Sequence, residues 1–144
     1  MYVLKMSTDY AIRSLLYLSK TRGYATSSEI AEAMSIPRSY ASQVLNKLKN
    51  AGMIQAKLGN AGGFALACDP KDVSMIDIIK LMNDSLCLNR CLERDRFCSR
   101  NATGNCSVHD LYKSIQDGVD SYLDQITLAE ILERQERIQA QVEI

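Results

Sequence analysis

Three cysteines and the only histidine of the chain fall within residues 91–109, with the spacing Cys91-x6-Cys98-x7-Cys106-x2-His109. Thiolates and imidazole are ligands for zinc and for iron–sulfur clusters, and the arginines nearby favour the thiolate form. The Cys-x2-Cys pairs of zinc ribbons are absent. The wide spacing between these cysteines suits a group that is larger than a single metal ion, such as an iron–sulfur cluster. We expect an iron–sulfur cluster, with a zinc site or a thiol-redox switch as alternatives.

The other two cysteines have a different setting. Cys68 follows an apolar stretch and Cys87 lies between two leucines, so both are interpreted as small buried hydrophobes. For Cys87, a spare ligand or a redox thiol is the alternative. A nucleophilic cysteine with His109 as its base is disfavoured, because no orienting acid or oxyanion element accompanies them. We therefore do not expect an enzyme.

Size and charge limit the class of protein. The chain has 144 residues and a formal net charge of zero, but 1–70 carry eight basic and four acidic residues and 71–144 carry nine and thirteen. There is no apolar run of about 20 residues that could span a bilayer and no secretory signal at the start, so we expect a cytoplasmic protein. Cytosolic thiols stay reduced, which disfavours a disulfide framework.

The first half predicts helices followed by a hairpin. Helices are expected over 10–20, after a capping box at Thr26 and Glu29, and over 38–50, ending at Gly52. The third helix has a buried face and a polar outer stripe; the outer residues are Arg38, Ser39, Ser42, Gln43, Asn46 and Lys49. A helix-turn-helix that reads DNA and a three-helix bundle with a solvated face explain this pattern about equally well.

A glycine-rich hairpin after these helices favours the DNA-binding interpretation. Strands are expected over 53–56 and 64–66, joined by the turn 59–63. Such a hairpin directly after a helix-turn-helix is a wing, which lies on the phosphate backbone or in the minor groove. The expected DNA-contacting residues of the wing are Lys57, Gly59, Asn60 and Gly62.

The second half predicts a dimerisation helix. Capping signatures at Ser74 and Ser107 begin two helices, the first ending near Asn83. The second has an apolar seam at intervals of four and three residues, formed by Leu111, Ile115, Val119, Tyr122 and Ile126. A dimer suits a helix-turn-helix protein because its two-fold symmetry matches a palindromic site. Residues 127–141 are expected to form a short surface helix.

Several motifs together resemble one family, the IscR/NsrR-type winged-helix transcription regulators that bind iron–sulfur clusters. They are MSTDYAIR (6–13), IPRSYASQ (36–43), GNAGGFAL (59–66), the three-cysteine loop and YLDQITL (122–128). The resemblance implies a mainly α fold with a β-hairpin wing and a long dimerisation helix. Residues 1–70 would form the winged helix-turn-helix domain, and 71–144 the cluster-binding loop and the dimerisation region.

The resemblance also implies a role for individual residues. It implies a homodimeric repressor or regulator of a palindromic operator, switched by a [2Fe-2S] or [4Fe-4S] cluster on Cys91, Cys98 and Cys106. The fourth ligand would be His109 or Asp9 of the partner subunit. Ser39 and Gln43 match base-contacting positions. Ser42 stands where a regulator of this family has a discriminating glutamate, and Leu58 stands where it has a minor-groove arginine. We therefore expect a preferred DNA sequence that differs from that of this regulator. Some members lack a cluster and act through cysteine oxidation.

Overall fold

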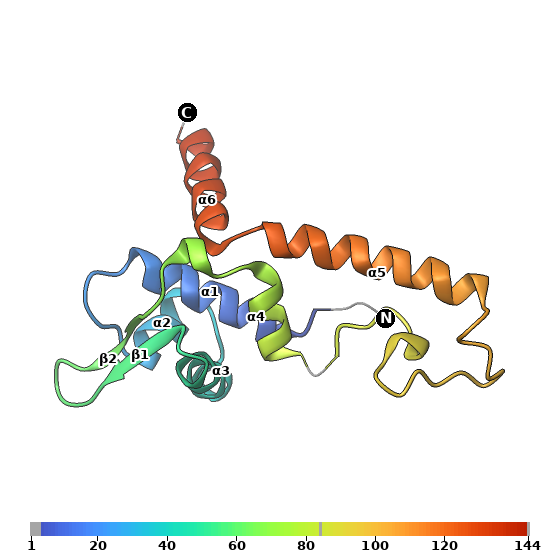
Figure 1. Ribbon diagram of the computed structural model, residues 1–144. Helices are drawn as coiled ribbons and strands as arrows, with labels where there is room; N and C mark the ends of the chain where they lie inside the picture. Colours follow the sequence, from blue (N-terminus) through green and yellow to red (C-terminus); the bar gives the residue numbers. More distant parts are fainter. Residues whose placement is uncertain (1–3, 84, 144) are drawn as a thin grey trace.

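The computed structural model describes residues 4–83 and 85–143 (Figure 1). The helices and strands follow one another as α1 (Met6–Lys20), α2 (Ser27–Ala33), α3 (Arg38–Asn50), β1 (Ile54–Lys57), β2 (Gly63–Leu66), α4 (Met75–Met82), α5 (Ser107–Gln125) and α6 (Leu128–Val142). Two short 3-10 turns, η1 (Pro70–Asp72) and η2 (Arg90–Leu92), lie between them. A mainly α fold with one two-stranded antiparallel hairpin is therefore confirmed. We call α1–α3, the hairpin and α4 the head.

Helix α1 begins at Met6, four residues before the start that apolar periodicity predicts. Its inner face continues the buried positions Leu15 and Ala11 back to Thr8, which is fully buried. Thr8 is polar, so it does not register as part of an apolar stripe. It is tolerated inside because its hydroxyl donates a hydrogen bond, as buried polar groups require.

The helix-turn-helix follows the predicted caps. Thr26 and Glu29 form a reciprocal capping box, with the Thr26 N–H donating to Glu29 Oε2 at 2.6 Å. Pro37 directly precedes α3, which spans the predicted residues. Its buried residues are the predicted ones, Ala41, Val44, Leu45 and Leu48. Gly52 follows the helix with a φ of +78°, a conformation that glycine adopts without strain.

A short bridge joins the wing to the segment between α1 and α2. β1 pairs with β2 from Ile54 opposite Leu66 to Lys57 opposite Gly63, a shift of one residue from the prediction. Phe64 exchanges two backbone hydrogen bonds with Ala25, at 2.9 and 2.7 Å. A Cβ at Gly63 would lie 2.4 Å from the Ala25 carbonyl oxygen, so only glycine permits this approach.

The chain returns to the head after α5. Met75 N–H donates to Ile126 O, and Leu128 N–H donates to Val73 O, both at 2.8 Å. Ile126 and Leu128 are buried in the same core as α1 and α4. The prediction that Ile126 belongs to the α5 seam is therefore wrong, because the helix ends at Gln125 and the next residue turns inward.

The predicted cap of α5 is also wrong. Cys106 occupies the N-cap position, makes no side-chain cap hydrogen bond, and leaves Ser107 as the first helical residue. In Figure 1 residues 85–106 form a loop beside the end of α5 that lies away from the head. We call residues 85–106 the thiol loop. The division of the chain at residue 70 stays a prediction, and residues 1–3 and 144 lie outside the described part.

Candidate DNA-binding surface and thiol loop

The outer face of α3 presents the residues that the sequence assigns to DNA. Arg38, Ser39, Ser42, Gln43, Asn46 and Lys49 are all exposed, while the other face of the helix is buried. Serine, glutamine and asparagine side chains can donate and accept hydrogen bonds, which base edges in the major groove require. The flanking Arg38 and Lys49 supply charge for phosphates. The helix therefore offers a polar stripe suited to DNA.

The wing presents a tight turn beside a lysine. Gly59 has a φ of +104°, and Gly62 N–H donates to Gly59 O at 3.0 Å. A Cβ at Gly62 would lie 2.1 Å from the Lys57 carbonyl oxygen, so the turn requires glycine there. Lys57, Gly59 and Asn60 are exposed and able to approach a phosphate backbone. Lys57 Nζ lies 5.6 Å from the Tyr24 ring centroid, a cation–π contact.

Tyr24 is a residue that sequence reasoning missed. It lies between α1 and the Thr26 cap, and the signal that could have found it is an aromatic residue in an otherwise small, polar turn. Leu58, next to Lys57, is 96% exposed, which leaves its side chain outside the core of the head.

The structure brings together two of the predicted ligands. His109 Nδ1 lies 3.3 Å from Cys91 Sγ, joining the thiol loop to the first turn of α5. Among residues 4–83 and 85–143, no three His, Cys, Asp or Glu side chains gather into a group that could hold a metal ion. The donor types therefore suit a cluster, but the arrangement shown pairs only Cys91 with His109.

Cys98 has its own electrostatic environment. Backbone N–H groups of Ala102 and Arg100 lower the pKa of the Cys98 thiol below its ordinary value, because they stabilise the thiolate. The chain turns sharply on both sides, with positive φ at Arg96 and Asn101. The Cys98 thiol therefore loses its proton more readily than an ordinary cysteine does, and the thiolate is the form that binds metals and reacts with oxidants.

A charged pair shapes the loop between Cys91 and Cys98. Arg90 donates two hydrogen bonds to the Asp95 carboxylate, at 2.6 and 2.5 Å. This contact lowers the pKa of Asp95. The Arg90 guanidinium also lies 5.6 Å from the Phe97 ring centroid. Both partners of the ion pair are exposed, so the pair defines the local shape of the loop more than it stabilises the fold.

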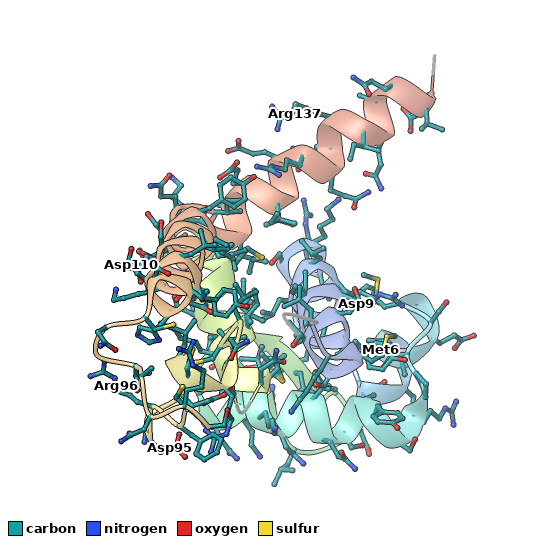
Figure 2. The ribbon with its side chains drawn as sticks, turned by 90° about the vertical axis from the view of Figure 1, so that its right-hand side faces the viewer. Met6, Asp9, Asp95, Arg96, Asp110 and Arg137 are labelled. Carbon is teal, nitrogen blue, oxygen red and sulfur yellow. The ribbon has the colours of Figure 1, made fainter. Side chains whose placement is uncertain are left out.

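Asp9 is placed away from the cysteines of its own chain. It lies on α1 and forms an ion pair with Arg13, at 2.6 Å. Figure 2 shows Asp9 on α1 well separated from Asp95 and Arg96 of the thiol loop. Within one chain, Asp9 therefore does not join Cys91 and His109.

An open cavity of about 760 Å³ lies between α4, the thiol loop and α5. Cys87, Cys91 and His109 are among its lining residues, together with Asn83 at the end of α4. Cys87 was expected to be a buried structural residue, but it is half-buried on the cavity wall. Cys68 is also half-buried and not fully buried as expected, although it packs against the core, its thiol donates to Met53 O at 3.4 Å and burial raises its pKa.

Two polar contacts connect the cavity with its surroundings. Thr8 Oγ1 donates to Asn83 Oδ1 at 2.8 Å, which joins α1 to the end of α4, next to the cavity. Leu88 N–H donates to Gln116 Oε1 at 2.7 Å, which joins the loop to α5. The cavity therefore contacts both the DNA-binding part and the long helix.

Comparison with known proteins identifies the family. Residues 4–134 match the Rrf2 family, described as iron-dependent transcriptional regulators. The chain belongs to the Rrf2 family. This confirms the resemblance inferred from the motifs, since IscR of Escherichia coli is 26% identical over 129 residues, covering 88% of this chain and 78% of that protein. A protein of Aquifex aeolicus named as a helix-turn-helix transcriptional regulator is 29% identical over 129 residues, which cover 89% of this chain and 90% of that protein.

Two solved structures share the fold of this chain. The T. potens IscR structure has a TM-score of 0.74 at 24% identity, covering 95% of this chain and 90% of that chain. CymR, the global cysteine regulator of B. subtilis, has a TM-score of 0.74 at 23% identity, and the match covers 93% of this chain and 98% of that chain. The protein is thus a helix-turn-helix transcription regulator and not an enzyme. None of the described helices is long and apolar enough to cross a membrane.

Proposed function

We propose that this Rrf2 protein is a homodimeric, sequence-specific regulator of a palindromic operator, and that chemistry at its thiol loop switches DNA binding. The observation that carries the proposal is the exposed polar stripe of α3 beside the glycine-bent wing. In such a complex α3 enters the major groove, where Ser39 and Gln43 contact bases and Ser42 and Asn46 extend the same stripe. Arg38, Lys49 and Lys57 contact phosphates. The protein would act in the cytoplasm, where its DNA is.

The exposed face of α5 supports the homodimer. Leu111, Ile115 and Tyr122 are 56, 43 and 58% exposed, although they form one apolar seam. Gly118, Val119 and Leu123 continue it in a shallow apolar groove along the helix. A second copy of the same helix would cover this face, and two-fold symmetry would set the two α3 helices on successive half-sites about one DNA turn apart.

The loop supports an iron–sulfur cluster as the switching group. Cys91, Cys98 and Cys106 would hold it, with His109 or Asp9 of the partner subunit as the fourth ligand. A cluster of the [2Fe-2S] or [4Fe-4S] type supplies electron-transfer and iron-dependent reactivity when bound. The chain itself holds the loop against α5 through the Leu88 N–H bond to Gln116, while the Thr8–Asn83 bond joins α1 to the end of α4. A change in the loop would then reach α1 and α5, and through them the spacing of the two α3 helices.

A second candidate is a cluster-free thiol regulator. The observation that favours it is the lowered pKa of Cys98, together with the absence of a three-ligand group among the described residues. Anaerobic purification followed by visible absorption and iron, sulfide and zinc analysis separates the candidates. Matched iron and sulfide in a coloured protein would support the cluster. Stoichiometric zinc in a colourless protein would support a structural staple, and no metal even after reconstitution would support the thiol switch.

The DNA-binding part has its own test. Selection from random duplex DNA would yield the operator, and fluorescence anisotropy at fixed salt would measure its affinity. We expect Gln43→Ala to cost about 1–3 kcal/mol of binding free energy and to relax specificity at one base pair. Gln139→Ala is the matched control, because Gln139 is an exposed glutamine on α6. Equal affinity of the two variants would contradict the assignment of α3 to the major groove.

A further inference from the structure

The five cysteines fall into distinct environments, and one pairing does not follow from the three-cysteine motif. Cys68 packs against the core of the head. Cys98 and Cys106 are not among the residues that line the cavity between α4 and α5. Cys87 and Cys91 both line that cavity. We propose that Cys87 and Cys91 are a redox pair that closes to an intramolecular disulfide when the cluster-free protein meets a hydroperoxide.

The local backbone bends the chain between these two residues. Cys87 N–H donates to Ser85 Oγ at 3.2 Å, and Cys91 N–H donates to Asn89 Oδ1 at 3.4 Å. The second contact is an Asx turn, and the 3-10 turn η2 follows directly. Cys87 Sγ donates to the carbonyl oxygen of Leu92, the residue after Cys91, at 3.4 Å. The Cys87 thiol therefore lies against the backbone that carries Cys91.

The alternative partners of Cys91 are less favourably placed. Cys98 is seven residues after Cys91, beyond the turn that the Arg90–Asp95 ion pair closes around Cys91 and beyond Arg96, whose φ is +49°. Cys106 precedes α5 and is further along the chain. Closing a ring of only a few residues costs little chain entropy compared with these longer rings. The open cavity gives a small oxidant access to both Cys87 and Cys91 and leaves space for their sulfur atoms to approach each other.

The reaction consumes one hydroperoxide for each disulfide. The Cys91 sulfur attacks one oxygen of hydrogen peroxide, the O–O bond breaks, and a sulfenic acid forms as water leaves. The Cys87 sulfur then attacks the Cys91 sulfur, the S–O bond breaks, and a second water leaves with the remaining thiol proton. Two thiols are oxidised by two electrons, and the peroxide is reduced to two waters.

The disulfide has a structural consequence beyond the pair. It withdraws the Cys91 sulfur from His109 and from any cluster, so the oxidised and cluster-bound states exclude each other. Cys87 also precedes Leu88, whose N–H bonds to Gln116 of α5. This role for Cys87 goes beyond the proposed function, and the peptide linkage that reports it forms without DNA or iron.

Tryptic mapping of the full chain tests the proposal directly. Trypsin places each cysteine in a separate peptide, 58–71, 81–90, 91–94, 97–100 and 101–113. The chain is reduced, freed of metal with a chelator, treated with hydrogen peroxide, and blocked with N-ethylmaleimide. We expect mass spectrometry to find 81–90 linked to 91–94 as the dominant oxidised species, and dithiothreitol to release both.

Two serine variants make the result specific. Cys87→Ser should abolish the linked peptide and leave Cys91 as a sulfinic acid, while Cys68→Ser, the matched control, should leave the linkage unchanged. Reduced Cys87→Ser should bind the operator as the unmodified chain does. Linkage of Cys91 to Cys98, to Cys106 or to a second chain would overturn the proposal. So would free, alkylated Cys87 beside oxidised Cys91 in the unmodified chain.

Discussion

The hydrogen bond between Thr8 and Asn83 provides a quantitative test of how α1 is joined to the end of α4, beside the cavity. Thr8 is fully buried and Asn83 is 9% exposed, so the 2.8 Å bond between them is largely shielded from water. Thr8→Val exchanges the hydroxyl for a methyl group of similar size and leaves the Asn83 carboxamide oxygen without this donor. An orphaned buried acceptor costs about 1–3 kcal/mol. For a chain of this length, that lowers the melting temperature by about 3–12 °C.

The assay is urea unfolding followed by circular dichroism, at one fixed protomer concentration because dimerisation contributes to stability. Thr21→Val is the matched control. Thr21 Oγ1 also donates a hydrogen bond, but to the Tyr17 carbonyl one turn earlier in a half-buried position. We expect the free energy of unfolding to fall less in Thr21→Val than in Thr8→Val. The slope of this free energy against urea concentration should stay unchanged in both variants.

A double-mutant cycle with Asn83→Ala completes the test. If the two side chains stabilise each other, the double variant should lose less free energy of unfolding than the two single variants lose in sum. The expected difference is about 0.5–3 kcal/mol. Additive losses, or a Thr8→Val variant as stable as Thr21→Val, would refute the reasoning that this bond joins α1 to the end of α4.

Three further predictions concern the thiols, the wing and α5. Backbone donors lower the pKa of Cys98 and burial raises that of Cys68, so iodoacetamide should alkylate Cys98 at lower pH; coincident pH profiles would contradict this. Gly62→Ala, whose Cβ would lie 2.1 Å from a backbone oxygen, should weaken operator binding in anisotropy, whereas Gly104→Ala, in open space, should not. Ile115→Asp should yield monomers in sedimentation velocity, whereas Val142→Asp, 80% exposed on α6, should not; a dimeric Ile115→Asp would argue against the α5 interface.

Local signals predicted the DNA-binding half well. The bounds and buried face of α3, the capping box before α2 and the two-stranded wing follow from residues within a few positions of one another. Helix caps, apolar periodicity and turn glycines act over such short distances, so they are visible in a linear sequence. The family resemblance rests on these stretches together with the three-cysteine loop and residues 122–128, and it is confirmed.

The errors concern positions whose environment is tertiary. Ile126 continues the spacing of the α5 seam, yet it is buried in the head because the chain turns inward after Gln125. Thr8 is polar but belongs to the core, through its bond to Asn83, 75 residues away. Ser107 has the sequence pattern of a cap, but Cys106 takes the N-cap position. In each case a distant contact or a shift of one residue determined the outcome.

Patterns along the chain, together with the family resemblance, predicted a winged helix-turn-helix regulator with a cysteine-rich loop before a long amphipathic helix, because caps, periodicity and turn glycines depend on near neighbours. Which thiols lie near one another depends instead on the tertiary structure. It set Cys91 against His109, placed Cys87 on the same cavity wall and bonded the end of α4 to α1. Spacing along a loop leaves its path in space open, and that path depends on the helices that the loop packs against.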